Sequence, residues 1–157
     1  MSENHTFEAT LTWPADPAQA LPPDPAFSRN AVLGSPGHPD FPGSSPTIFG
    51  GEASRYNPEE LVTIALAHCH MLTYLALAAK KRVAVLAYED RATAVLGKDP
   101  ASGKMKLISA QLRPKVTVAK GTNLEDARAM HAKAHEYCFV SNSVNFPVAN
   151  APKIVER

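Results

Sequence analysis

Hydrophobic and polar residues alternate near the start of the chain, in "HTFEATLTW" (residues 5–13). The apolar positions on one side of this stretch are Phe7, Ala9, Leu11 and Trp13. A period of two is typical of a β-strand with one buried face. We therefore predict a half-buried strand here.

Prolines set the next segment apart. Nine of the 14 prolines fall within residues 14–46, together with several glycines and serines. This composition predicts a long irregular segment, interrupted by one short strand at "FSRNAVL" (27–33). The chain has no internal repeat and no sign of a second domain, so we expect residues 1–157 to form a single domain.

A long helix is predicted after this segment. Asn57 is a good N-cap, Pro58 suits the first helical position, and Glu60 completes an N-x-x-E capping box. The helix is expected to run to about Lys81, and the cationic residues there suit the negative end of a helix.

The middle of this helix, residues 61–79, contains no Asp, Glu, Lys or Arg. A run of 19 residues just reaches the length of a membrane span. Polar side chains inside the run argue against a span, and they are Thr63, His68, His70, Thr73 and Tyr74. We expect a buried core helix that is surrounded on every side, because it is apolar all round.

Two β-rich runs follow, at residues 83–95 and 105–119, and the turn-rich "GKDPASGK" (97–104) separates them. This pattern predicts a long antiparallel hairpin. The chain ends in a short candidate strand, "KIVE" (153–156).

A second helix is predicted from Thr122, which forms a capping box with Glu125. The positions expected to face inward are Leu124, Ala127, His131, Ala134 and Cys138. Strand runs and two helices without βαβ alternation indicate an α+β fold.

Composition narrows the range of functions. The 157 residues are 45% hydrophobic and 20% charged, with a net charge of +1, as expected of a soluble globular domain. No block of like charge suggests a nucleic-acid partner. No secretory signal is visible, so we expect a cytoplasmic protein. Two cysteines in a reducing compartment indicate catalysis, redox chemistry or metal binding, against the alternative of two inert buried thiols.

Both cysteines are expected to point inward from helices, so Cys69 and Cys138 can meet in space although they lie far apart in the sequence. A thiol is a nucleophile only as thiolate, and its ordinary pKa of about 8.5 must be lowered for that role. Burial raises the pKa instead. A reactive Cys69 therefore needs a positive partner, and arginine supplies a permanent charge where histidine does not.

Histidines surround both thiols in the sequence. His68 and His70 point about 100° to either side of Cys69, and we expect them to pack rather than to bind a ligand. His131, His135 and Cys138 lie on neighbouring faces of one helix, and a fourth ligand from Cys69 or His70 would complete a tetrahedral zinc site. No CxxC or HExxH motif accompanies them, so zinc binding is a minor alternative and we expect no metal.

Three stretches carry a family resemblance: "NPEEL", "AHCHML" with Cys69 ten residues after Glu59, and "AHEYCFVSNSVN" around Cys138. From about residue 57 to 147 the chain resembles the OsmC/Ohr family of thiol peroxidases. The resemblance implies an OsmC-like α+β fold, an intertwined homodimer and reduction of organic hydroperoxides without a cofactor. The resemblance does not imply that the protein binds nucleic acid or a membrane.

The resemblance also implies roles for individual residues. Cys69 would attack the peroxide, and Cys138 would resolve the sulfenic acid to a disulfide. A dithiol reductant (a lipoyl protein, a thioredoxin-like protein or a small thiol) would restore the pair. Glu59 matches the glutamate that orients an arginine against the thiolate.

The arginine itself departs from the pattern. Phe49 stands twenty residues before Cys69, where the OsmC branch has its arginine. Arg29 is the best replacement in the sequence, and Arg55 is the second candidate.

Helix geometry adds a constraint on Glu59. Ten residues of α-helix rise about 15 Å, so Glu59 cannot reach Cys69 of its own chain along a straight helix. A second copy with an antiparallel central helix would bring it there. We expect a substrate pocket lined by Met71, Leu72 and Phe139. The alternative function is a non-catalytic OsmC-like protein that binds a small ligand or serves a stress response.

Overall fold

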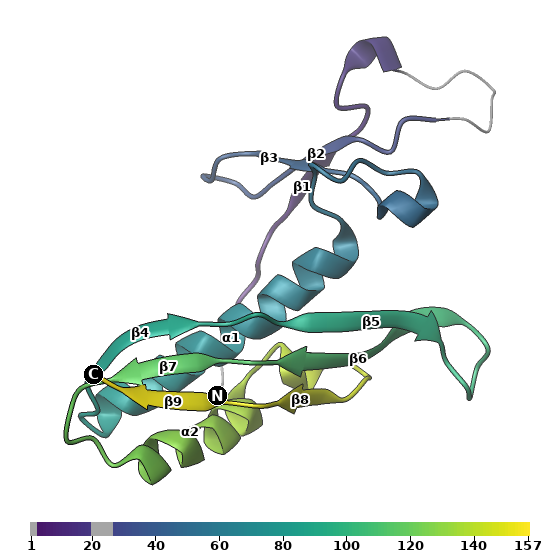
Figure 1. Ribbon diagram of the computed structural model, residues 1–157. Helices are drawn as coiled ribbons and strands as arrows, with labels where there is room; N and C mark the ends of the chain where they lie inside the picture. The colour runs from purple at the N-terminus through teal and green to yellow at the C-terminus, as the bar shows by residue number, and fades with distance from the viewer. Residues whose placement is uncertain (1–2, 20–26) are drawn as a thin grey trace. The chain divides into compact units, whose positions relative to one another are not determined.

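The computed structural model describes residues 3–19 and 27–157, which divide into two compact units, up to Pro58 and from Glu59 onward. Figure 1 shows the elements of both units. The prediction of a single domain across 1–157 stays a prediction. Residues 20–26 of the predicted irregular segment lie outside the described residues.

The N-terminal unit contains a three-stranded antiparallel sheet in the order β1-β2-β3. Its elements are β1 (Thr10–Thr12), η1 (Pro17–Gln19), β2 (Ala31–Gly34), β3 (Phe41–Gly43) and η2 (Thr47–Phe49). The short strand expected at 27–33 is present in part as β2. The alternating strand at 5–13 is reduced to β1, whose three residues are all exposed, Leu11 to 71%, so the half-buried strand that the pattern predicts is not found within the N-terminal unit. The sequence pattern did not predict β3, because this strand contains Pro42 and proline is uncommon inside strands.

The first long helix, α1 (Pro58–Lys80), begins and ends close to its predicted bounds. The N–H of Arg82 donates to the carbonyl of Ala79, and the N–H of Val83 donates to that of Ala78. Arg82 has a φ of 56°, in the left-handed region. This pattern is a Schellman motif, which ends the helix by satisfying its last carbonyl groups.

The C-terminal unit builds two mixed sheets, in the orders β4-β7-β9 and β5-β6-β8. Their strands are β4 (Val85–Glu89), β5 (Thr93–Lys98), β6 (Met105–Leu112), β7 (Lys115–Val118), β8 (Val148–Asn150) and β9 (Lys153–Glu156). In Figure 1, β4 leads into β5, β6 into β7, and β8 into β9. Pro114 lies between β6 and β7, and Pro152 lies between β8 and β9. Proline interrupts the strands there because it has no N–H group to donate to a neighbouring strand.

The predicted long hairpin is confirmed. β5 and β6 are antiparallel, with Lys98 opposite Met105, and β4 pairs antiparallel with β7. The last strand, β9, is also confirmed, and it lies parallel to β7. β8 was not predicted, because three residues give too short a pattern.

The second helix, α2 (Leu124–Tyr137), starts one residue later than predicted. Its N-cap is Asn123, whose side chain accepts from the N–H groups of Glu125 and Asp126. The hydroxyl of Thr122 instead donates to the carbonyl of Ala119. The predicted cap was therefore wrong, because Thr122 caps the preceding turn.

One core cluster joins both helices to a single face of β7 and β9. Its buried residues are Tyr74, Ala78, Val116, Val118, Ala127, Met130, Ala134 and Ile154. A second cluster surrounds Leu66, Ala110 and Leu112. Strands, hairpin and two helices confirm the α+β fold class. Leu124, predicted to face inward, is 40% exposed, and Met130 takes the buried position instead.

One side of α1 packs inside the unit, through Leu66, His70, Tyr74 and Ala78. On another side Ile64 is 48% exposed and Leu72 is 52% exposed. The C-terminal unit by itself therefore does not surround the helix on every side. Within the described chain, α1 alone has the length and hydropathy to cross a membrane, which is weak evidence because core helices share that composition.

Candidate active site

The two cysteines come together in the C-terminal unit. Cys69 lies midway along α1 and is half-buried, whereas Cys138 is fully buried, and both are free thiols. Their side chains are in hydrogen-bonding contact. Cys138 is not inside the second helix as predicted but is the C-cap residue that follows it. Two free thiols in contact can form a disulfide with little movement of the chain.

The loop after α2 supplies N–H groups to both sulfur atoms. The N–H of Ser141 donates to Cys138 Sγ at 3.4 Å, and the N–H groups of Phe139 and Val140 bond to the Cys69 sulfur. A 3-10 turn, η3 (Ser141–Ser143), holds this loop in place. Backbone N–H groups that point at a sulfur stabilise its thiolate form.

These N–H groups do not make Cys69 acidic by themselves. Burial is the largest influence on the Cys69 pKa and raises it, and the hydrogen bond with Cys138 raises it further. The N–H groups of Val140 and Phe139 act in the other direction, but the pKa stays above its ordinary value. Cys69 therefore still needs a cation to become a thiolate near neutral pH.

Glu59 lies in the first turn of α1, ten residues before Cys69 on the same unbroken helix. That separation corresponds to about 15 Å of rise, so the carboxylate does not contact the thiol of its own chain. Glu59 Oε2 is shielded from solvent and, among the described residues, has no hydrogen-bond partner. A buried carboxylate oxygen of this kind is a natural acceptor for a guanidinium.

The two candidate arginines lie in the N-terminal unit and differ in their partners. Arg55 donates to Glu52 at 3.0 Å, which forms an ion pair. Arg29 stacks over the ring of Phe27, with Cζ 4.6 Å from its centroid, and donates to the Phe27 carbonyl. In the described part of the chain, the ion pairs include Arg55 but not Arg29.

The histidines divide into exposed and buried ones. His68 is exposed on α1, whereas His70 and His131 are buried, and His70 Nε2 lies 3.0 Å from His131 Nδ1. The expected packing role is therefore confirmed for His70. His135 and Cys138 do not join them in a metal site, because no described group of three His, Cys, Asp or Glu residues has that geometry.

Burial determines the charge of the two packed histidines. It lowers the pKa of His70 to about 4, with a smaller contribution from His135. It lowers the pKa of His131 to about 3, assisted by His70 and Arg128. Both imidazoles are therefore neutral at physiological pH.

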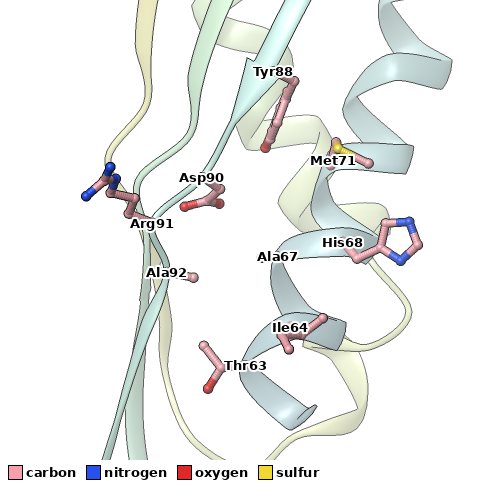
Figure 2. A pocket seen from close by; sticks show the side chains of 9 residues that line it. All are labelled: Thr63, Ile64, Ala67, His68, Met71, Tyr88, Asp90, Arg91 and Ala92. Carbon is pink, nitrogen blue, oxygen red and sulfur yellow. The ribbon is translucent and has the colours of Figure 1, made fainter. Parts of the chain in front are cut away.

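The predicted substrate pocket beside the thiols stays a prediction. Met71 lines a cavity of about 370 Å³ between α1 and the junction of β4 with β5 (Figure 2). Leu72 and Phe139 are 52% and 83% exposed, and neither lines this cavity. Cys69 does not line it either.

Comparisons with known proteins match residues 51–150 to a protein family described as OsmC-like protein. The chain belongs to the OsmC family. An OsmC-like protein of unknown function from Vibrio cholerae is 34% identical, with a TM-score of 0.85 over 97% of this chain and 99% of that chain. No curated protein matches the chain significantly.

Two organic hydroperoxide resistance proteins share the OsmC-like fold. The protein from Elizabethkingia anophelis is 20% identical, with a TM-score of 0.72, and the match covers 100% of both chains. The protein from Bacillus subtilis is 21% identical, with a TM-score of 0.62, and the match covers 96% of this chain and 98% of that chain.

Sequence reasoning missed two features of this OsmC family member's site. The N–H groups of Phe139 and Val140 carry no side-chain signal, and only the fold aims them at Cys69. Asn150 Nδ2 lies 3.1 Å from His70 Nε2, across 80 residues of sequence. The polar residues of "SNSVN" after Cys138 indicate a hydrogen-bonded loop. They do not indicate that its N–H groups point at Cys69.

Proposed function

We propose that this protein is a cysteine-based peroxidase that reduces organic hydroperoxides to alcohols. The observation that carries the proposal is the contact between two free thiols, Cys69 in the middle of α1 and Cys138 at the C-cap of α2. Membership of the OsmC family and the fold shared with organic hydroperoxide resistance proteins support it.

The proposed cycle has three balanced steps. The Cys69 thiolate attacks the terminal oxygen of the hydroperoxide, the O–O bond breaks, and the alkoxide takes a proton to leave as alcohol. The resulting sulfenic acid condenses with the Cys138 thiol to form a disulfide and water. A dithiol reductant of lipoyl, thioredoxin-like or small-thiol type then reduces the disulfide, as suits the reducing cytoplasm that we propose as its compartment.

Reduced protein mixed with cumene hydroperoxide and dithiothreitol tests this function. We expect peroxide loss over many turnovers and, without dithiothreitol, a disulfide between Cys69 and Cys138 in the peptide mass spectrum. A protein that neither consumes hydroperoxide nor forms this disulfide would support the non-catalytic alternative of small-ligand binding.

We propose Arg29 as the cation that activates Cys69, in the assembled protein. Arg55 is already paired with the carboxylate of Glu52, whereas Arg29 forms no ion pair with a carboxylate of the described residues, and this difference favours Arg29. Its proposed orienting partner is Glu59, whose Oε2 is buried and has no described partner.

Arg29→Ala is expected to slow hydroperoxide turnover. A cation close to an acidic group lowers its pKa by about 1–3 units, so loss of the cation reduces the thiolate fraction by roughly 10- to 1000-fold near neutral pH. The profile of kcat/KM against pH should move to higher pH, and Arg29→Lys should recover part of the loss. Arg55→Ala is the matched control, expected to stay within about twofold. An unchanged pH profile in Arg29→Ala would exclude this role.

We also propose a homodimer that packs through the exposed side of α1. Ile64 and Leu72 lie there, half-exposed, on a helix otherwise built for a core. A second copy would cover them and, with its α1 antiparallel, would bring its Glu59 toward Cys69.

Leu72→Glu is expected to convert the dimer to a monomer of 16.8 kDa, because a carboxylate buried at the helix contact has no partner. Light scattering coupled to size-exclusion chromatography measures the mass. Leu124→Glu, on α2, is the control and should leave the dimer intact. A wild-type protein that is monomeric at micromolar concentration would contradict the proposal.

A further inference from the structure

The two sulfur atoms of the thiol pair differ in how far solvent reaches them. Cys138 has an exposed fraction of 0%, whereas Cys69 is half-buried and keeps part of its surface in contact with solvent. Thiol–disulfide exchange requires an incoming thiolate to touch one of the two sulfur atoms, and access to each atom affects which one it attacks. The difference in burial therefore bears on how a disulfide between these cysteines is reduced.

Cys138 is fixed inside the C-terminal unit by contacts of its own backbone and sulfur. Its N–H donates to the carbonyl of His135 at 3.4 Å, and its carbonyl accepts the N–H of Asn142 at 3.0 Å. Its sulfur accepts the N–H of Ser141 at 3.4 Å. These contacts hold the residue at the junction of α2 and η3, so exposure of its sulfur requires this junction to open.

Cys69 lies at the edge between two sides of α1. Successive residues of an α-helix are about 100° apart, so His70 and Leu72 lie about 100° and about 60° to opposite sides of Cys69. His70 is 0% exposed, and Leu72 is 52% exposed. The Cys69 side chain therefore has the core on one flank and the exposed side of α1 on the other.

A second copy of the chain does not change which sulfur is reachable. The proposed dimer covers the exposed side of α1, and added contacts can only reduce the exposure of either cysteine. The hydroperoxide must still touch Cys69 for the proposed reaction to occur, so the assembled protein needs an opening to that sulfur. Cys138 needs no such opening, because it reacts only with the sulfenic acid beside it.

Leaving-group chemistry acts in the other direction, but it is the smaller effect. The N–H groups of Phe139 and Val140 stabilise Cys69 as a departing thiolate, as the proposed cation does, and this favours attack on Cys138. If the leaving thiol has a Brønsted coefficient of about 0.5, like the attacking one, a pKa lowered by about 3 units changes the rate about 30-fold. A core site is open in only about one molecule in a thousand or fewer, so access has the larger effect.

We propose that a reductant attacks the disulfide at Cys69, so that the mixed disulfide forms on Cys69 and Cys138 leaves as the free thiol. The disulfide in question is that of the proposed function, on which this step therefore rests. The thiolate of the reductant bonds to Cys69 Sγ, the Cys69–Cys138 bond breaks, and Cys138 Sγ takes the electron pair and then a proton. The N–H of Ser141 stabilises the departing Cys138 thiolate.

The second step of the reduction releases Cys69. The other thiol of a dithiol reductant attacks the reductant's own sulfur in the mixed disulfide, which closes the oxidised reductant, and Cys69 leaves with the electron pair. The N–H groups of Phe139 and Val140 stabilise this thiolate. Hydroperoxide and reductant thus meet the protein at the same atom, Cys69 Sγ, and Cys138 touches neither of them.

The test uses the full-length protein in its native assembly, oxidised to the disulfide with diamide, and 2-mercaptoethanol as the probe. A monothiol has no second thiol with which to complete the reduction, and acid stops the exchange by protonating the thiolates. Samples are quenched early, before exchange between the two cysteines, and peptide mass spectrometry shows which of them carries the probe. We expect at least about tenfold more adduct on Cys69 than on Cys138.

The same oxidised protein unfolded in guanidinium chloride is the matched control. Both sulfur atoms are open there, so the adduct should divide about equally between the two cysteines. A preference for Cys69 that persists in the unfolded chain would come from the local sequence and not from burial, and it would overturn the proposal.

Two single-cysteine variants give a second measurement that needs no disulfide. Cys138→Ser leaves only Cys69, and Cys69→Ser leaves only Cys138. The rate with 4,4′-dithiodipyridine is measured in the folded protein and divided by the rate of the same variant in guanidinium chloride. This ratio should be at least about tenfold higher for Cys69 than for Cys138. Thermal unfolding of both variants checks that a reactive Cys138 does not reflect a lost fold.

The outcomes separate this proposal from the proposed function. Adduct mainly on Cys138, adduct shared equally in the folded protein, or equal rate ratios in the two variants would overturn the proposal. If no adduct can be trapped, the rate ratios decide. A disulfide that forms with diamide but not with cumene hydroperoxide would contradict the peroxidase alone, and a protein that neither oxidant converts to the disulfide would contradict both.

Discussion

Cys69→Ser should lower hydroperoxide turnover by on the order of a thousandfold or more, because a serine hydroxyl is not ionised near neutral pH and is a weak nucleophile. The change is nearly isosteric at a half-buried position, and the N–H groups of Phe139 and Val140 remain in place. The fold and the dimer should therefore survive. Loss of turnover with an unchanged unfolding midpoint assigns the first chemical step to Cys69.

Cys138→Ser should separate the two steps. The first attack can still occur, but the sulfenic acid on Cys69 has no thiol beside it to condense with. We expect one equivalent of hydroperoxide to be consumed rapidly and dimedone to label Cys69, as measured by mass spectrometry. Met105→Leu removes an exposed sulfur atom on β6 and should behave like the wild type. Full turnover in Cys69→Ser, or no label in Cys138→Ser, would contradict the assigned roles.

The elements that sequence predicted well have strong local signals. α1 combines a proline at its first position with a long apolar run, and the hairpin combines alternating runs with a turn-rich connection. β3 and β8 have three residues each, and their existence depends on a neighbouring strand that the local pattern does not reveal. The N-cap of α2 is Asn123 and not the predicted Thr122, because the Thr122 hydroxyl donates to the carbonyl of Ala119 in the preceding turn. The local pattern does not reveal this contact either.

The candidate site also contains features that the sequence predicted and features that it did not. The thiol pair could be predicted, because two inward cysteines on apolar faces are a pattern of residue types. The donors to Cys69 could not, because they are backbone groups of Phe139 and Val140 that only the loop after α2 aims at the sulfur. The apolar run of α1 predicts a helix that is surrounded on every side, and the C-terminal unit by itself does not surround it. The structure leaves Ile64 and Leu72 half-exposed, and this is why we place a second copy there.

The buried pair His70 and His131 should make the fold sensitive to mild acid. Both pKa values are lowered by burial, to about 4 and about 3, whereas an unfolded histidine titrates near 6.5. Below that value the unfolded chain binds more protons than the folded one, so stability falls with pH and continues to fall until the folded pKa values are reached. Each histidine contributes about 1.4 kcal/mol per pH unit in this window.

The free energy of unfolding should be roughly 4 kcal/mol lower at pH 5 than at pH 7. Each of the two histidines contributes over the roughly 1.5 pH units between its unfolded pKa and pH 5. That is a large share of the 5–15 kcal/mol typical of a domain. Urea denaturation at pH 5, 6 and 7 measures the slope. The groups around the pair, His135, Arg128 and the ring of Tyr74 at 4.2 Å from His131, contain no carboxylate that would hold a proton there.

His131→Phe keeps a ring against Tyr74 and removes one of the two titrating groups. Its stability at pH 7 should drop, because His70 Nε2 loses a hydrogen-bond partner, but its slope between pH 5 and 6 should be shallower by about 1.4 kcal/mol per pH unit. His38→Asn removes an exposed histidine of the N-terminal unit and should leave the slope unchanged. Equal slopes in His131→Phe and the wild type would mean that His131 is already charged in the folded protein, and the neutral buried pair would have to be abandoned.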